Sequence, residues 1–291
     1  MIDYDFPLWR PPSEGDNLII QATLGCRFNG CTFCSMYKVK EYRPRPLPAV
    51  FDDIAAAARV WPEAHRVFLA DGDAYALPTA HLEAICDRLA ATFPALQRIS
   101  AYATPFNLLG KSVEDIRRLK AKKLSVVYVG IETGSDRLLR RIGKGTLKQM
   151  EGGLARAAEA GLKVSATVIT GLGGATHWQE HVDETAALLG RVPVTFLSTL
   201  QLHLAEEVEA RFLEKFAEPF VWQDDGAILA ELRRLVERLE PAAPLIFRSN
   251  HASNALPLAG TLPKDRARVL ATIDQAMAGG DGLRPRWMRG L

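Results

Sequence analysis

The sequence has few cysteines, no long apolar run and almost no net charge. Lys and Arg number 36 against 34 Asp and Glu, so the formal net charge is +2. This balance gives no electrostatic reason to expect a nucleic acid partner. No apolar run approaches the length of a membrane span. The opening residues lack the basic and apolar regions of a signal peptide, so we expect a cytoplasmic protein that does not associate with membranes.

The chain has four cysteines, and three of them are crowded at Cys26, Cys31 and Cys34, which argues against disulfides. This pattern indicates a reducing compartment and a metal site. Three thiolates on one loop can hold three irons of a cubane cluster and leave the fourth iron open. A structural zinc site would normally need four protein ligands, and no second cysteine pair follows.

The remaining cysteine, Cys86, could serve as a fourth ligand, because the plant-type [2Fe–2S] spacing also begins C-x4-C-x2-C. However, Cys86 shares a helical apolar stripe with Leu82, Ile85, Leu89 and Phe93, which is typical of a helix that faces a core. Free cysteine is also among the most frequently buried residue types. We therefore favour three ligands and keep Cys86 as the alternative.

Short apolar segments alternate with amphipathic ones along most of the chain. The predicted strands are residues 18–23, 66–70, 99–103, 125–131, 163–169 and 194–200, and the predicted helices are residues 50–61, 78–93, 112–121, 135–160 and 177–189. This alternation predicts an α/β fold with parallel strands and right-handed crossovers. About six such units are fewer than the eight of a closed barrel, and a doubly wound sheet is the alternative.

Ligands bind at the carboxyl ends of the strands in both architectures. The second predicted strand is followed by Asp71, Gly72 and Asp73, and the fourth by Glu132. Taken singly, such residues are more often turn or solvated residues. His177 and His181 have a zinc-compatible spacing but no third ligand, so we place them on a helix surface.

The three-cysteine loop, with Phe33 directly before its last cysteine, resembles the radical S-adenosylmethionine (SAM) superfamily. Here four residues separate the first two cysteines, where that family most often has three. The resemblance implies a partial (β/α)6 TIM-like barrel with a helical C-terminal extension. The barrel would span residues 15–204 and the extension residues 205–291.

The resemblance also implies an activity. Cys26, Cys31 and Cys34 would hold a [4Fe–4S] cluster, and SAM would chelate its open iron. Reductive cleavage of SAM would yield a 5′-deoxyadenosyl radical that abstracts hydrogen from a substrate. The substrate would be a small molecule, and the electron would come from an external donor of the flavodoxin or ferredoxin type. A non-catalytic iron–sulfur carrier or sensor that uses Cys86 is the alternative.

Further site residues follow from the same resemblance. The residues expected to contact SAM are Phe33, Asp71, Gly72, Asp73, Glu132, Lys144, Ile169 and Gly171. In the extension, the block from Phe247 to Leu258 is rich in hydrogen-bonding side chains between apolar flanks. We predict that Arg248, Asn250 and His251 bind or orient substrate, while a structural network that joins the extension to the barrel is the alternative.

Overall fold

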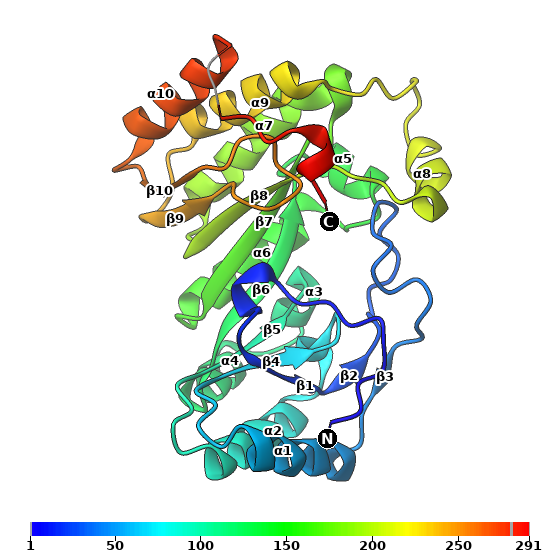
Figure 1. Cartoon of the computed structure of the whole chain (residues 1–291), viewed down its shortest axis with the longest axis vertical. Coiled ribbons are helices and arrows are strands. Elements are labelled where there is room, and N and C mark those ends of the chain that lie inside the picture. Colours follow the sequence, from blue (N-terminus) through cyan, green and yellow to red (C-terminus); the bar gives the residue numbers. More distant parts are fainter. Residues whose placement is uncertain (1, 280–281, 291) are drawn as a thin grey trace. The chain divides into compact units, whose positions relative to one another are not determined.

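A computed structural model describes residues 2–279 and 282–290 of the chain (Figure 1). Strands and helices alternate through most of it, because the apolar residues switch between the periods of the two structures. The strands in the described part are β1 (Leu18–Gln21), β2 (Thr23–Leu24), β3 (Arg43–Pro44), β4 (Arg66–Ala70), β5 (Arg98–Tyr102), β6 (Leu124–Glu132), β7 (Lys163–Thr170), β8 (Phe196–Gln201), β9 (Leu245–Arg248) and β10 (Ala259–Leu262).

Several helices begin at residues that satisfy the first backbone N–H groups. Ser112 Oγ accepts a hydrogen bond from Asp115 N at 3.0 Å, and Asp115 Oδ2 accepts one from Ser112 N at 3.2 Å, which is a reciprocal capping box. The helices in the described part are α1 (Leu47–Val60), α2 (Thr79–Thr92), α3 (Pro105–Leu109), α4 (Val113–Ala121), α5 (Asp136–Arg141), α6 (Leu147–Glu159), α7 (Gly174–Arg191), α8 (Glu206–Leu213), α9 (Asp225–Arg238) and α10 (Arg266–Met277).

Eight of the described strands form one sheet in the order β1-β4-β5-β6-β7-β8-β9-β10. The pairs β1–β4, β4–β5, β5–β6, β7–β8 and β8–β9 are parallel, and β9–β10 is antiparallel. Parallel strands are usually covered on both faces, which explains why the central strands are almost continuously apolar. The prediction of an α/β fold with a mainly parallel sheet is confirmed.

The chain divides into two compact units. Residues 1–29, 36–129 and 155–164 make up the first unit, and residues 30–35, 130–154 and 165–291 make up the second. These limits differ from the expected boundary between residues 204 and 205, which stays a prediction. The cysteine loop contributes residues to both units, and each unit is described by itself below.

The first unit contains a core of strand side chains and a set of packed helices. Ile19 of β1 and Phe68 of β4 are buried, and Tyr102 and Tyr128 pack against them. α1 packs on α2, and α2 contacts α4. The largest buried side chains of this unit include Tyr75, Phe68 and Phe93. Their burial stabilises the strand ends from which the site loops leave.

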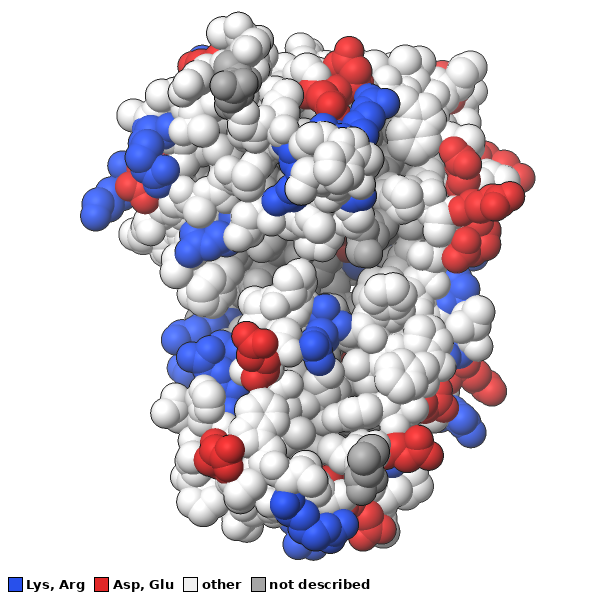
Figure 2. All heavy atoms as spheres, viewed as in Figure 1, with Lys and Arg blue, Asp and Glu red and all other residues white. Residues whose placement is uncertain are grey.

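The second unit has a core in which α7 packs on α9 and α9 packs on α10. A further cluster surrounds Phe212 of α8 and Phe216, and Leu138 of α5 and Leu172 belong to it. The first turn of α8 carries Glu206, Glu207 and Glu209, and Figure 2 shows acidic side chains gathered over this helix. Acidic residues in a first turn interact favourably with the positive end of the helix dipole.

Two predictions about secondary structure were wrong in part. Residues 135–160 form two helices, because Gly143 and Gly145 adopt φ values of +69° and +93° between α5 and α6. Left-handed glycines of this kind end helices. The C-terminal extension is also not only helical, since β9 and β10 lengthen the sheet. In the described residues, no helix is both long and apolar enough to cross a membrane.

We predict that Gly134→Ala destabilises the protein by about 2 kcal/mol, because overpacking a fitted site typically costs this much. A Cβ at this position would lie 2.2 Å from the carbonyl oxygen of Glu184, and backbone can move little to relieve the clash. Gly226→Ala is the control, because its nearest neighbour in the same test is Asp224 Oδ1 at 3.4 Å. Urea unfolding measures both variants, and equal stabilities would contradict the prediction.

Candidate functional site

The start of the cysteine loop is fastened to the carboxyl end of β4 by Asp71. Its Oδ2 atom accepts hydrogen bonds from Gly25 N at 3.0 Å and from Lys40 Nζ at 3.1 Å, and its Oδ1 atom accepts one from Gln21 Nε2 at 3.1 Å. Asp71 is fully buried, and this burial raises its pKa in spite of the three hydrogen bonds. The carboxylate thus holds the residue directly before Cys26.

Gly72 lies where the end of β4 approaches the cysteine loop. A Cβ at this position would lie 2.5 Å from the Tyr37 ring and 3.1 Å from Cys26 Cβ. Only a residue without a side chain permits this approach. The next residue, Asp73, is 1% exposed. The structure therefore brings Gly72 next to Cys26, and it buries Asp73 nearby in the same unit.

In the second unit, Cys31 and Cys34 belong to a segment that is fastened to the turn after α5. Thr32 N donates a hydrogen bond to the Ile142 carbonyl oxygen at 2.9 Å. Gly143 lies so close that a Cβ would be 3.1 Å from the Gly30 carbonyl oxygen. The glycine turn that separates α5 from α6 is thus also the surface on which this half of the cysteine loop rests.

Lys144 follows that turn and forms a buried ion pair with Glu132 at the end of β6. Lys144 Nζ donates to Glu132 Oε1 at 2.8 Å, and the two side chains are 12% and 6% exposed. Burial alone would lower the pKa of Lys144, but the Glu132 carboxylate and then the Cys31 and Cys34 thiols outweigh it, so the pKa is raised. The structure therefore brings two predicted SAM residues together beside two predicted cluster ligands.

The backbone around Glu132 adopts an unusual conformation that accommodates this ion pair. Glu132 has a φ of +59°, a left-handed conformation that costs a residue with a side chain about 1–2 kcal/mol. A Cβ on Gly130 would lie 1.9 Å from Glu132 Oε1 and 3.1 Å from Lys144 Nζ. The carboxylate therefore folds back over a position that only glycine can occupy. Outliers of this kind are concentrated at functional sites.

Phe33 and Ile169 both pack against the apolar cluster that contains Leu138 and Phe212. Gly171, after β7, has a φ of +83°. Its N–H donates to Glu231 Oε1 at 2.8 Å. Phe33 and Ile169 thus share one apolar cluster, and Glu231 holds the backbone at Gly171.

The placement of two histidines on a helix surface was wrong. His177 and His181 of α7 are 9% and 1% exposed. His177 Nε2 contacts Glu218, while His181 Nδ1 lies 2.8 Å from Thr133 Oγ1 and its Nε2 lies 3.4 Å from Glu231 Oε1. Sequence periodicity missed this because Glu218 and Glu231 come from distant parts of the chain.

The block after β9 is divided between buried and exposed side chains. Asn254 Nδ2 donates to the Thr199 carbonyl oxygen at 2.6 Å, and its Oδ1 accepts from Gln201 N at 2.8 Å, so this residue joins the block to β8. Arg248 and Asn250 are exposed. Burial and the nearby Arg284 lower the pKa of His251. The substrate role of these last three residues stays a prediction.

Cys86 lies on α2 and is fully buried. Burial raises the pKa of its thiol to about 12. A thiol that resists ionisation in an apolar core is a poor metal ligand, because metals bind the thiolate. The arrangement therefore favours the structural interpretation of this residue.

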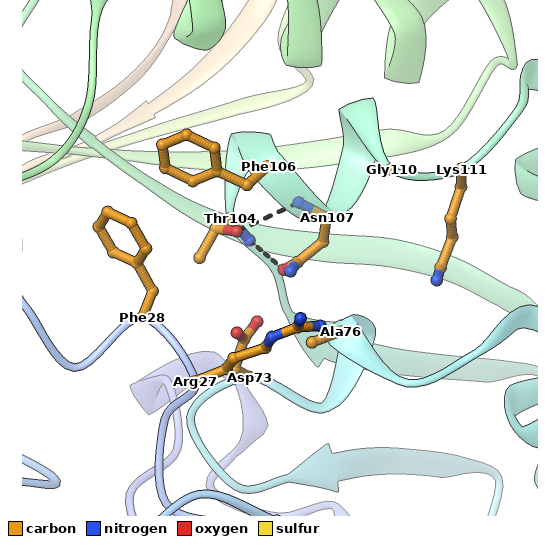
Figure 3. A pocket seen from close by; sticks show the side chains of 9 residues that line it. All are labelled: Arg27, Phe28, Asp73, Ala76, Thr104, Phe106, Asn107, Gly110 and Lys111. Carbon is orange, nitrogen blue, oxygen red and sulfur yellow. Dashed lines mark hydrogen bonds between the residues drawn. The ribbon is translucent and has the colours of Figure 1, made fainter.

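A cavity of about 420 Å³ opens in the first unit (Figure 3). Its lining comes from the cysteine loop and from the segments after β4 and β5. The lining residues are Arg27, Phe28, Asp73, Ala76, Thr104, Phe106, Asn107, Gly110 and Lys111. Asp73 is the only one of them that the sequence predicted as a site residue.

The described cysteines are thiols, and their chemistry fits an iron–sulfur cluster. Lys144 places a positive charge near Cys31 and Cys34, and iron–sulfur clusters are held by cysteine side chains. Within residues 2–279 and 282–290, no group of three or more His, Cys, Asp or Glu side chains is gathered as a metal site. The assignment of the three cysteines to a cluster therefore stays a prediction from their spacing.

Comparison with known proteins decides the family. Residues 20–189 match the radical SAM superfamily. The chain belongs to this superfamily. Members of this superfamily are enzymes that bind a [4Fe–4S] cluster and SAM.

A provisionally named methylthiotransferase of Methanocaldococcus jannaschii is 28% identical to this radical SAM protein over 169 residues. The match covers 54% of the chain and 35% of the relative. The chain thus spans about a third of the length of this curated relative.

Several radical SAM structures share the fold. Coproporphyrinogen III oxidase (HemN) from Escherichia coli has a TM-score of 0.56 at 17% identity, over 76% of this chain and 51% of that one. The hydrogenase maturase HydG from Carboxydothermus hydrogenoformans has a TM-score of 0.52 at 18% identity, over 89% and 58%. The methyltransferase TsrM from Kitasatospora setae has a TM-score of 0.51 at 20% identity, over 64% and 36%. These likenesses support the predicted TIM-like partial barrel.

Sequence reasoning on this radical SAM protein missed Arg27, Phe106 and Lys111. Arg27 lies within the cysteine loop, Phe106 lies on α3, and Lys111 follows α3. One signal was present, because Arg27 and Phe28 follow the first cysteine directly. The lysine and the second phenylalanine could be recognised only after the strand ends were placed side by side.

We predict that Asp71→Asn destabilises the protein by roughly 3 kcal/mol and lowers iron incorporation. Removal of one partner from a buried charged network typically costs this much, and the asparagine amide would point N–H groups at other donors. Urea unfolding and iron content per chain measure the two effects.

Asp5→Asn is the matched control for Asp71→Asn. Asp5 Oδ1 also pairs with Lys40, at 2.9 Å, but its side chain is 47% exposed. An exposed ion pair contributes about 0–1 kcal/mol. Equal losses of stability in the two variants would contradict the anchoring role of Asp71.

Proposed function

We propose that this chain holds a [4Fe–4S] cluster through Cys26, Cys31 and Cys34, cleaves SAM reductively and acts on a small-molecule substrate. When both groups are bound, they would supply one-electron cleavage of SAM and hydrogen abstraction from the substrate by a 5′-deoxyadenosyl radical. The electron comes from an external donor of the flavodoxin or ferredoxin type. The observation that carries the proposal is the buried Lys144 cation, which Glu132 holds beside Cys31 and Cys34.

Lys144 has the chemistry to bind the SAM carboxylate. An ammonium has three donors, and Glu132 Oε1 accepts one of them at 2.8 Å. The two remaining N–H donors of the ammonium can bind a carboxylate that approaches beside the cysteine loop. Because Glu132 keeps the lysine charged and in place, the cation is already oriented when the cofactor arrives. In this proposal Glu132 positions Lys144, and Lys144 contacts the cofactor.

The other predicted SAM residues supply complementary surfaces. Asp73 is a buried carboxylate, which suits the SAM ammonium because an ammonium donates and a carboxylate accepts. Phe33 and Ile169 present apolar side chains at the edge of the cluster around Leu138, which suits the adenine. Gly171 allows close approach of the backbone.

We predict that the reconstituted, reduced protein forms 5′-deoxyadenosine from SAM under anaerobic conditions. Cys34→Ser should lose both the cluster absorbance and the product, because the cluster needs all three thiolates. Cys86→Ala should keep both, since Cys86 is a core residue in this proposal. Chromatography of the nucleoside products and visible spectroscopy measure the outcomes.

Two results would contradict this function. A fully reduced cluster that never cleaves SAM, even with candidate substrates present, would argue against the enzyme. Loss of the cluster in Cys86→Ala, with the fold retained, would support the carrier or sensor with a fourth protein ligand.

We predict that Lys144→Met weakens SAM binding at least ten-fold, because loss of a desolvated charged partner costs about 2 kcal/mol or more. Lys148→Met is the matched control, since Lys148 is exposed on α6. Calorimetric titration with SAM measures both affinities, and Lys144→Arg should restore part of the binding through its retained charge. Equal SAM affinity in Lys144→Met and the unmodified protein would rule out the assigned role.

A further inference from the structure

The cavity of the first unit has the position and size of a small-molecule site. It opens beyond the carboxyl ends of β4 and β5, and residues 27 and 28 of the cysteine loop form part of its wall. Its volume of about 420 Å³ lies within the usual range for such sites. The cavity lies next to Cys26 in sequence, so a molecule bound in it would be close to the first predicted cluster ligand.

One end of the cavity is cationic. Lys111 is 7% exposed. Its Nζ atom donates a hydrogen bond to the Leu77 carbonyl oxygen at 2.7 Å. The same atom lies 5.4 Å from the centroid of the Tyr75 ring. Figure 3 shows Arg27 extending along the opposite wall, with its guanidinium beside Ala76 and on the side of the cavity nearer to Lys111. Burial of a cation is costly unless an anion compensates it.

The lining itself supplies less negative charge than positive charge. Arg27 and Lys111 are cations, and Asp73 is the single carboxylate among the lining residues. Burial lowers the pKa of Lys111, and the charges of Asp115 and Asp73 oppose this lowering. A bound anion would complete the balance, because it would bring the second negative charge into the cavity.

The neutral polar residues of the lining are occupied with each other. Asn107 Oδ1 accepts a hydrogen bond from Thr104 N at 2.6 Å, and Thr104 Oγ1 accepts one from Asn107 N at 3.2 Å. Figure 3 shows this pair in the middle of the cavity wall. These two acceptors cap the first turn of α3 and are occupied by that role. Discrimination between charged and neutral ligands therefore comes from the cationic end of the cavity.

The other end of the cavity is aromatic. The rings of Phe28 and Phe106 are stacked, with their centroids 4.8 Å apart and their planes at 28°. Figure 3 shows both rings away from Lys111. Stacked rings offer a flat apolar surface, against which a ring or a short hydrocarbon chain gains contact area. Charge and apolar surface are therefore separated along the cavity.

We propose that this cavity binds the substrate, and that the substrate carries an anionic oxygen group at Lys111 and Arg27 and an apolar body against Phe28 and Phe106. The inference rests on the proposed function, since it names the substrate class of that site. The shared chemistry is the anionic oxygen group, which a carboxylate or a phosphate monoester can supply.

The test uses the full chain with its cluster reconstituted and without reductant, so that no turnover occurs. The probes are 3-phenylpropionate with its neutral partner 3-phenylpropionamide, and 2-phenylethyl phosphate with its neutral partner 2-phenylethanol. Ligand-observed NMR titration measures binding. At least one acid should bind ten-fold or more tightly than its neutral partner, and the better of the two identifies the acid group.

Matched variants connect the binding to named residues. Lys111→Met should weaken binding of the acid at least ten-fold, and Arg27→Gln about three-fold, since an exposed charge is screened by solvent. Arg27 is exposed, so its variant keeps the test decisive if the buried lysine variant does not fold. Lys120→Met, on the exposed surface of α4, should bind the acid normally. Phe106→Leu should weaken the acid and its neutral partner equally.

Three results would overturn the inference. The first is equal binding of each acid and its neutral partner, including no binding of either. The second is unchanged binding of the acid in folded Lys111→Met and Arg27→Gln. The third is displacement of the acid by SAM. Formation of 5′-deoxyadenosine is measured separately. A protein that cleaves SAM but fails these tests contradicts only the substrate class, whereas one that binds the acids but never cleaves SAM contradicts the proposed function.

Discussion

The buried ion pair between Glu132 and Lys144 is the interaction on which the site of the second unit depends. Two charges that are largely removed from water must stay together, because loss of one partner leaves the other uncompensated at a cost of roughly 3–5 kcal/mol. Several local features serve this pair. Gly130 leaves room for the carboxylate, Glu132 adopts a positive φ, and Gly143 turns the chain so that Lys144 points inward. The end of β6 and the turn after α5 are therefore coupled.

The two halves of the cysteine loop are held by opposite charges. In the first unit, the Asp71 carboxylate accepts the N–H of Gly25 directly before Cys26. In the second unit, the Lys144 cation acts on Cys31 and Cys34. An anion suits a backbone donor, and a cation suits a thiolate. Each half of the loop thus meets the charge that its own chemistry requires.

The parallel sheet explains why side chains from distant segments share one site. Parallel strands release their loops at carboxyl ends that lie side by side, so residues after β4 and β5 line the same cavity. Asp73 and Lys111 are separated in the sequence by α2, β5 and α3, yet the charge of Asp73 acts on Lys111. The close approach of Gly72 to Cys26 shows the same principle at the scale of single atoms.

Six of the eight strands of the sheet, β1 and β4 to β8, could be predicted within two residues, because buried parallel strands are nearly continuous apolar runs between polar turns. The strands β9 and β10 of the extension were not predicted. The helix break at Gly143 was missed, since the apolar period continues across it. The buried positions of His177 and His181 were missed as well, because their partners Glu218 and Glu231 lie outside their own helix. Residue types and spacings were thus informative wherever the controlling interaction was local.

The sequence by itself determined the family, the α/β class and the positions of the cysteine loop and the strand-end motifs, because each of these depends on residues close together along the chain. Only the tertiary structure decided that Asp71 anchors the loop, that Lys144 is a buried cation and that Arg27, Phe106 and Lys111 line one cavity. The hydrogen bond from Gly25 to Asp71 joins residues 46 positions apart. Burial and pairing over such separations depend on how the strands are ordered, and local periodicity does not encode that order.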